Sequence, residues 1–115
     1  LRVTAALHGN LKKSSKVFIV TSRMGSVDDN TSGGSYGYRM SKAAVNMAGK
    51  SLSVDLADEG IAVFLMHPGW VSTEMTGGTG IPVSESAEGL IQTMDGLTME
   101  KTGTFWHQEG YQLPW

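Results

Sequence analysis

Two short apolar runs on either side of a long helical pattern constrain the fold of this chain more than any other feature. Residues 16–21 read Lys-Val-Phe-Ile-Val-Thr, and residues 61–66 read Ile-Ala-Val-Phe-Leu-Met. Neither run alternates with polar residues, which is typical of parallel strands covered on both faces. Between them the sequence predicts a helix over residues 35–58, with Gly60 as its stop. Its apolar face would consist of Val45, Ala48, Leu52 and Leu56. Strand, helix and strand in this order predict a βαβ unit with a right-handed crossover.

Weaker patterns extend this unit at both ends. Residues 1–11 resemble the end of a helix, because Val3, Leu7 and Leu11 recur every four residues. Residues 84–94 predict a further helix with Ser84 as its N-cap. Residues 102–106 predict a short strand, and residues 111–115 predict an irregular tail. The chain is therefore expected to form an α/β fold with about three strands and flanking helices.

Polar side chains and a Pro-Gly step fall at one predicted edge of the sheet. Ser22 follows the first strand, and Pro68 and Gly69 follow the second. Tyr38 and Lys42 open the helix between the strands, and its start lies on the side where the first strand ends. Ligands of open parallel sheets bind beyond the carboxyl ends of the strands. We therefore expect these five residues to meet in one site.

The spacing of Tyr38 and Lys42 suggests acid–base chemistry at this edge. Residues four apart share one face of a helix. An ammonium group beside a phenol favours the phenolate, which would make Tyr38 usable as an acid or base near neutral pH. The pair alone is weak evidence, because any helix can carry these two residues by chance. Whether the pair is catalytic depends on Ser22 and on the segment after the second strand.

Composition excludes several other classes of function. With 115 residues the chain is one domain at most, and a hydrophobic content of 40% with 17% charged residues is typical of a globular protein. A formal charge of −2 gives no reason to expect nucleic acid as a partner. The absence of Cys excludes disulfides and thiolate metal sites and fits a cytoplasmic location. No apolar run approaches the roughly 20 residues that cross a bilayer, and no signal peptide is visible, so no membrane partner is expected.

Several motifs in fixed order resemble one family. They are Val20-Thr21-Ser22-Arg23-Met24-Gly25-Ser26, Asp29-Asn30-Thr31-Ser32-Gly33-Gly34, Tyr38-Arg39-Met40-Ser41-Lys42-Ala43-Ala44, Ser51-Leu52-Ser53-Val54-Asp55-Leu56, His67-Pro68-Gly69-Trp70-Val71-Ser72-Thr73 and the ending from Gly103-Thr104-Phe105 to Leu113-Pro114-Trp115. Together they resemble the short-chain dehydrogenase/reductases, and within them the C-factor-like or sniffer-like carbonyl reductases. The resemblance runs over nearly the whole chain. It implies a Rossmann-type, doubly wound parallel sheet and an oxidoreductase that reduces an aldehyde or ketone to an alcohol.

The resemblance also implies roles for individual residues. Ser22 would bind and polarise the carbonyl oxygen of a small substrate, and Tyr38 would donate a proton to the alkoxide. Lys42 would favour the phenolate form of Tyr38 and hydrogen-bond the nicotinamide ribose, so Tyr38 and Lys42 would both contact the cofactor. The nicotinamide carboxamide would be received by Pro68, Gly69, Val71 and Thr73. The cofactor implied is NADP(H) rather than NAD(H), and His67 would be structural.

Other parts of the family pattern have no counterpart among the 115 residues. The glycine-rich dinucleotide fingerprint and the Asn-Asn-Ala-Gly stretch are both missing. The chain is therefore expected to be the C-terminal portion of a single Rossmann domain, holding the proton-transfer half of the site. Two interpretations stay open: a carbonyl reductase in its complete form, or a truncated, catalytically inactive piece with a structural or interaction role. The small residues of the helix over 35–58 favour close packing within the domain, with a homodimer as the second interpretation.

Overall fold

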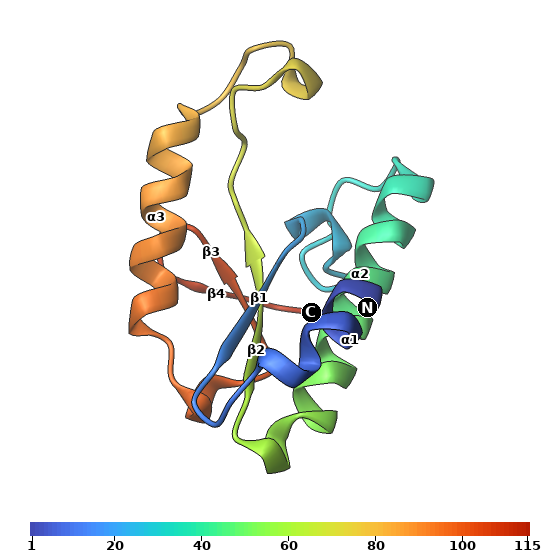
Figure 1. The fold of residues 1–115 in the computed structure, drawn as a ribbon. Coiled ribbons are helices and arrows are strands. Elements are labelled where there is room, and N and C mark those ends of the chain that lie inside the picture. Colours follow the sequence, from blue (N-terminus) through green and yellow to red (C-terminus); the bar gives the residue numbers. More distant parts are fainter.

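The computed structural model describes all residues 1–115 and centres on a four-stranded sheet in the order β1-β2-β3-β4 (Figure 1). The strands are β1 (Lys16–Val20), β2 (Ala62–His67), β3 (Thr104–His107) and β4 (Gln112–Leu113). The first three are parallel to one another, and β4 pairs antiparallel with β3. The expected α/β fold is confirmed. The expectation of an irregular tail was wrong for residues 112–113, because these residues pair with Phe105 and Trp106.

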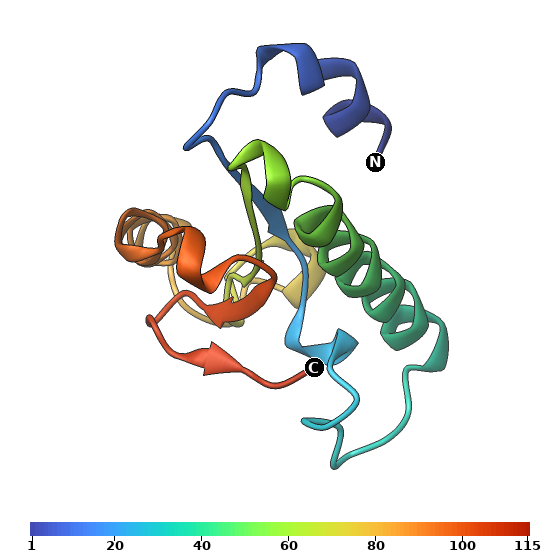
Figure 2. The same ribbon diagram turned by 90° about the horizontal axis from the view of Figure 1, so that it is seen from below.

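Two long helices cover opposite faces of the sheet. Helix α2 (Tyr36–Asp55) connects β1 to β2 and lies on one side, and α3 (Val83–Gly96) connects β2 to β3 and lies on the other (Figures 1 and 2). The short helix α1 (Arg2–Leu7) precedes the sheet and has no buried residue. Isolated 3₁₀ turns complete the connections: His8–Asn10, Arg23–Gly25, Ala57–Glu59, Glu74–Thr76 and Met99–Lys101. None of the helices combines the length and the apolar character needed to cross a membrane.

Strand β2 is the centre of the core. Every one of its residues is buried, as expected for a strand with neighbours on both sides and helices on both faces. Phe64 and Met66 pack towards Leu97 and the inner face of α3, while Leu65 packs with Phe105 and Leu113. The continuous apolar run at 61–66 therefore reflects a strand with no solvent-exposed face.

The buried face of α2 differs from the expected one. The most buried residues are Asn46, Gly49 and Ser53, whereas Val45, Ala48 and Leu52 are only half-buried. Small residues lie innermost because the helix approaches β2 closely, and a Cβ atom at Gly49 would press into the side chain of Leu65. The Oδ1 of Asn46 accepts a hydrogen bond from Thr21 Oγ1 at 2.9 Å, whereas its Nδ2 is buried without a partner.

One helix boundary differs from the predicted one. Helix α3 starts at Val83 with Pro82 at the N-cap position, so the expectation that Ser84 caps it was wrong. Ser84 lies in the first turn, and the fixed φ of Pro82 begins the helix instead. By contrast, Gly60 ends the segment after α2 as expected, with a φ of +69° that an L side chain rarely adopts.

Candidate active site at the carboxyl edge of the sheet

A cavity of about 1160 Å³ lies at the carboxyl ends of β1 and β2. It is lined by all seven residues singled out in the sequence: Ser22, Tyr38, Lys42, Pro68, Gly69, Val71 and Thr73. They come from three separate segments, namely the turn after β1, the first two turns of α2 and the loop after β2. The βαβ topology therefore brings them together as expected, although their chemical roles remain predictions.

Ser22 is held in a defined orientation at the end of β1. The residue is buried, and it precedes the 3₁₀ turn Arg23–Gly25 in the N-cap position. Ser22 Oγ accepts a hydrogen bond from the backbone N–H of Met24 at 3.2 Å. Because this bond uses an oxygen lone pair, the hydroxyl proton of Ser22 is free to be donated to a ligand in the cavity.

Tyr38 and Lys42 lie on the face of α2 that borders the same cavity. The Lys42 Nζ atom is 5.5 Å from the centre of the Tyr38 ring, close enough for a cation–π contact. Neither the phenol oxygen nor the ammonium group hydrogen-bonds another group of the chain, although the backbone carbonyl of Tyr38 accepts from Ser41 Oγ at 2.8 Å. Tyr38 remains 39% exposed, so both polar groups are open to a ligand.

The loop after β2 forms the opposite wall and offers backbone donors. Pro68 is anchored through its carbonyl, which accepts a hydrogen bond from Ser86 Oγ on α3 at 2.6 Å. Gly69 follows with a φ of +84°, a conformation suited to glycine. Val71 forms an isolated parallel bridge with Ile81, made by the N–H groups of Ser72 and Ile81. The N–H of Val71 itself has no partner in the chain, so it is available to a carbonyl oxygen of a ligand.

Two buried histidines, His67 and His107, also line the cavity. The sequence predicted a structural role for His67 and no role for His107. His67 and His107 are paired in the register of β2 and β3, and their rings meet edge to face at 5.0 Å. His107 in turn stacks on Tyr111 at 4.6 Å and accepts a hydrogen bond from the N–H of Glu109. No local sequence signal reveals this cluster, because 40 positions separate the two histidines and only the strand register joins them.

Burial favours the neutral form of both histidines. Burial, with a smaller repulsion from His107, lowers the pKa of His67 from 6.5 to about 4. Burial also lowers the pKa of His107, against the opposing attraction of Glu109. The Nδ1 atom of His67 is buried without a hydrogen-bond partner, and the attraction of Asp29 for a positive charge on the ring is outweighed by the cost of burial.

This lowered pKa predicts acid sensitivity. Because unfolded His67 takes up a proton first, its contribution to stability is present above pH 6.5 and is lost as the pH falls towards about 4. The loss should approach about 3 kcal/mol, and His67→Asn should be less acid-sensitive than the wild type by that amount. Urea unfolding at both ends of this pH range measures the difference. Equal losses in wild type and variant would contradict it.

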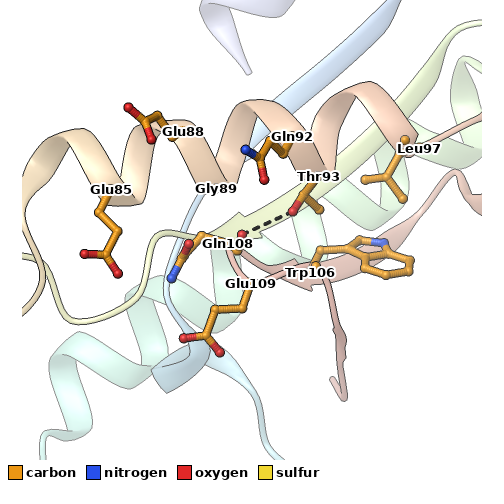
Figure 3. Close-up of a pocket in the computed structure, with 11 residues that line it drawn as sticks. Glu85, Glu88, Gly89, Gln92, Thr93, Leu97, Trp106, Gln108 and Glu109 are labelled. Carbon is orange, nitrogen blue, oxygen red and sulfur yellow. Dashed lines mark hydrogen bonds between the residues drawn. The ribbon is translucent and has the colours of Figure 1, made fainter.

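A second, smaller cavity of about 620 Å³ lies beside α3 and the turn after β3 (Figure 3). Its polar lining includes Glu85, Glu88 and Glu109, and Thr93 Oγ1 donates a hydrogen bond to the backbone carbonyl of Gln108 at 3.2 Å. It contains none of the residues singled out in the sequence. No cluster of three or more His, Asp or Glu side chains suited to a metal ion occurs there or elsewhere in the chain.

Comparison with known proteins identifies the family. The family model for short chain dehydrogenases matches residues 1–81, which is more than half of the chain. The chain belongs to the short chain dehydrogenase family. Among curated members it is 48% identical to C-signal of Myxococcus xanthus over its full length, covering 71% of that protein. It is also 46% identical to 1-hydroxy-2-glutathionyl-2-methyl-3-butene dehydrogenase of a Rhodococcus species, covering 53% of that enzyme.

Solved structures of short chain dehydrogenases agree with the fold. The carbonyl reductase Sniffer of D. melanogaster superimposes with a TM-score of 0.83 at 35% identity, over the whole chain and 48% of that protein. A short-chain dehydrogenase/reductase from Burkholderia multivorans with bound NADP gives a TM-score of 0.84 at 30% identity, over 99% of the chain and 50% of that protein. The chain thus spans about half the length of these structures and represents a Rossmann-type fold in part.

Proposed function

We propose that this chain carries the proton-transfer half of an NADPH-dependent carbonyl reductase, which reduces an aldehyde or ketone to an alcohol. The observation that carries the proposal is the meeting of Ser22, Tyr38 and Lys42 in one cavity with the loop after β2. Membership of the short chain dehydrogenase family supports the oxidoreductase class. Several proteins of similar structure, from chicken, D. melanogaster and Pseudomonas aeruginosa, are named carbonyl reductases, which favours a carbonyl substrate.

The geometry of Ser22, Tyr38 and Lys42 permits a distinct role for each residue in the reaction. Ser22 donates a hydrogen bond from its free hydroxyl to the carbonyl oxygen, keeps its proton, and so stabilises the negative charge that develops there. Tyr38, whose phenol is unpaired and open to the cavity, gives its proton to the same oxygen as general acid. The nearby ammonium of Lys42 stabilises the phenolate that remains. Water restores the proton to Tyr38 once the product has left.

The loop after β2 fits the nicotinamide end of a dinucleotide. The unpaired N–H of Val71 suits the carboxamide oxygen, and Gly69 lets the backbone pass close to a planar ring. Pro68 and Thr73 border the same space, and Tyr38 and Lys42 face it from α2. When bound, NADPH supplies the hydride. We favour NADP(H) over NAD(H), because similar structures were solved with NADPH or NADP bound.

The activity is to be assayed in a protein that joins this chain to a dinucleotide-binding half, either its own or that of a family member. We call this protein the complete enzyme. It should oxidise NADPH in the presence of some members of a panel of aliphatic and aromatic aldehydes and ketones, with the matching alcohol as product. No oxidation with any carbonyl, in a protein shown to bind NADPH, would overturn the proposal.

The 115-residue chain alone is expected to bind NADPH weakly or not at all. It lacks the glycine-rich turn that joins a strand directly to a helix and supplies the diphosphate site in dinucleotide-binding folds. The glycines at 77–80 precede α3 but lie ten residues beyond the end of β2. Isothermal titration calorimetry of the chain, beside the complete enzyme, measures the difference. Binding of equal affinity in both would contradict the expectation.

A second candidate function is that of a non-catalytic structural or interaction domain. The relative called C-signal, 48% identical to this chain, does not carry the name of an enzyme. The two candidate functions are compatible with the same fold. They predict different results for the complete enzyme, since only the first predicts that it reduces carbonyl compounds. Activity that depends on Tyr38 would exclude the second candidate for that protein.

We also propose that α2 joins two copies of the protein. Met40, Met47 and Val54 follow one another at seven-residue spacing along α2, and all three are about two-thirds exposed. Such a spacing places them in one stripe along the helix, suited to an antiparallel partner helix. Sedimentation equilibrium of wild type and Met47→Glu tests this interface, and a monomer in both would exclude it.

A further inference from the structure

Two arginines hold the loop that connects the candidate catalytic residues. Arg23 directly follows Ser22, and Arg39 directly follows Tyr38. Both bind the connecting loop, residues 26–35. The Arg23 guanidinium donates through Nε and Nη2 to the two carboxylate oxygens of Asp29, each at 2.9 Å. The Arg39 guanidinium donates to Ser32 Oγ at 3.0 Å and to the carbonyls of Gly33 and Gly34 at 3.2 Å.

The contact between Arg23 and Asp29 is the more specific of the two. It is bidentate, which fixes orientation as well as distance. Asp29 is itself fixed, because its N–H donates to Ser26 Oγ at 3.0 Å and Ser26 is almost fully buried. The hydrogen bond between the two side chains raises the pKa of Arg23 and lowers the pKa of Asp29, so both are charged at neutral pH.

The placement of this ion pair indicates a role in the site rather than in global stability. Both side chains are partly exposed, and exposed ion pairs contribute little to the free energy of unfolding. Arg23 nevertheless belongs to the 3₁₀ turn Arg23–Gly25, in which the Ser22 hydroxyl accepts a hydrogen bond from the N–H of Met24. From the other side the same turn rests on the α2 backbone at Lys42, through Gly25. The turn Arg23–Gly25 with Ser22 before it, which we call the Ser22 turn, is therefore held from two directions.

We propose that the Arg23–Asp29 ion pair is a positioning contact, which keeps the Ser22 hydroxyl aligned with the Tyr38 phenol. The proposal rests on the proposed carbonyl reduction and adds to it a residue, Asp29, that touches neither substrate nor cofactor. Asp29 acts through Arg23 on the orientation of the Ser22 turn. Loss of its charge keeps the Ser22 side chain but lets the turn move, so that the Ser22 hydroxyl is no longer held in alignment with Tyr38.

The test uses Asp29→Asn in the complete enzyme, with Asp28→Asn as a matched control. Asp28 is exposed, and its carboxylate forms none of the salt bridges of the chain. Because small misplacements of a reacting group are costly, Asp29→Asn should lower kcat about 10- to 100-fold. The KM for NADPH and the melting temperature should stay unchanged. Asp28→Asn should behave as wild type.

The same Asp29→Asn substitution, made in a Ser22→Ala variant, shows whether Asp29 acts through Ser22. In Ser22→Ala, measured by single turnover, Asp29→Asn should cause no further loss, because there is no hydroxyl left to position. The positioning role alone would be overturned if Asp29→Asn lowered the rate equally in wild type and in Ser22→Ala. It would also be overturned if Asp29→Asn kept full activity while Ser22→Ala and Tyr38→Phe were inactive. Full activity of Tyr38→Phe would overturn the proposed function, and this inference with it.

Discussion

Replacing Tyr38 with Phe in the complete enzyme is expected to lower kcat about 1000-fold while leaving NADPH affinity unchanged. General acid catalysis contributes about 10²- to 10⁴-fold, and Tyr38 is the phenol that lies beside Lys42 in the cavity. The ring itself is kept, so the contact of Lys42 with its face and the packing of α2 are preserved. Steady-state kinetics and NADPH fluorescence titration measure the two quantities separately.

Tyr36→Phe is the matched control for this variant. Tyr36 lies two residues earlier on the same helix, is 79% exposed and does not line the cavity. The same hydroxyl is therefore removed from the same helical turn without touching the site. Wild-type turnover is expected in Tyr36→Phe. A loss of similar size in both variants would mean that the hydroxyl of Tyr38 has no special role.

Replacing Gly25 with Ala is expected to destabilise the protein and to impair catalysis. A Cβ atom at Gly25 would lie 2.6 Å from the carbonyl carbon of Lys42 and 2.9 Å from the backbone nitrogen of Ala43. Both are backbone atoms of a helix, which cannot move aside as a flexible side chain can. Overpacking of this kind costs about 1–3 kcal/mol of stability. The turn must shift away from α2, carrying Ser22 with it, so kcat should fall by about 100-fold.

Gly96→Ala serves as the control for the added methyl group. Gly96 ends α3 and has no positive φ, and a Cβ atom at this position would meet no other atom within 4 Å. Alanine is also the better helix former, so this variant should be neutral or slightly more stable. Chemical denaturation and kinetics of the two variants are compared side by side. Wild-type stability and activity of Gly25→Ala would show that the Ser22 turn does not depend on this close approach.

Much of the fold was predictable because the strongest sequence signals are local. The apolar run at 16–21 contains strand β1 (Lys16–Val20), and strand β2 (Ala62–His67) is shifted by one residue from the run at 61–66. The meeting of Ser22, Tyr38, Lys42 and Pro68 followed from βαβ topology, since the carboxyl ends of parallel strands share one edge. Connectivity therefore sufficed to place these residues before any contact was known.

The features that escaped prediction depend on contacts between distant segments. Asn46 and Gly49 are buried in α2 because of how closely the helix approaches β2, which helical periodicity does not reveal. The stack of His67, His107 and Tyr111 requires the register of β2 and β3 together with the turn before β4. The pairing of Arg23 with Asp29 likewise requires the path of the loop between them.

The most direct test of the account follows the hydride and its dependence on Tyr38 together. The complete enzyme is supplied with NADPH deuterated at the transferring position of the nicotinamide and with a carbonyl compound that it consumes. Mass spectrometry of the alcohol should show deuterium on the former carbonyl carbon with wild type and Tyr36→Phe, and almost no product with Tyr38→Phe. Alcohol without deuterium, or labelled alcohol formed equally fast by Tyr38→Phe, would contradict a carbonyl reductase in which Tyr38 donates the proton.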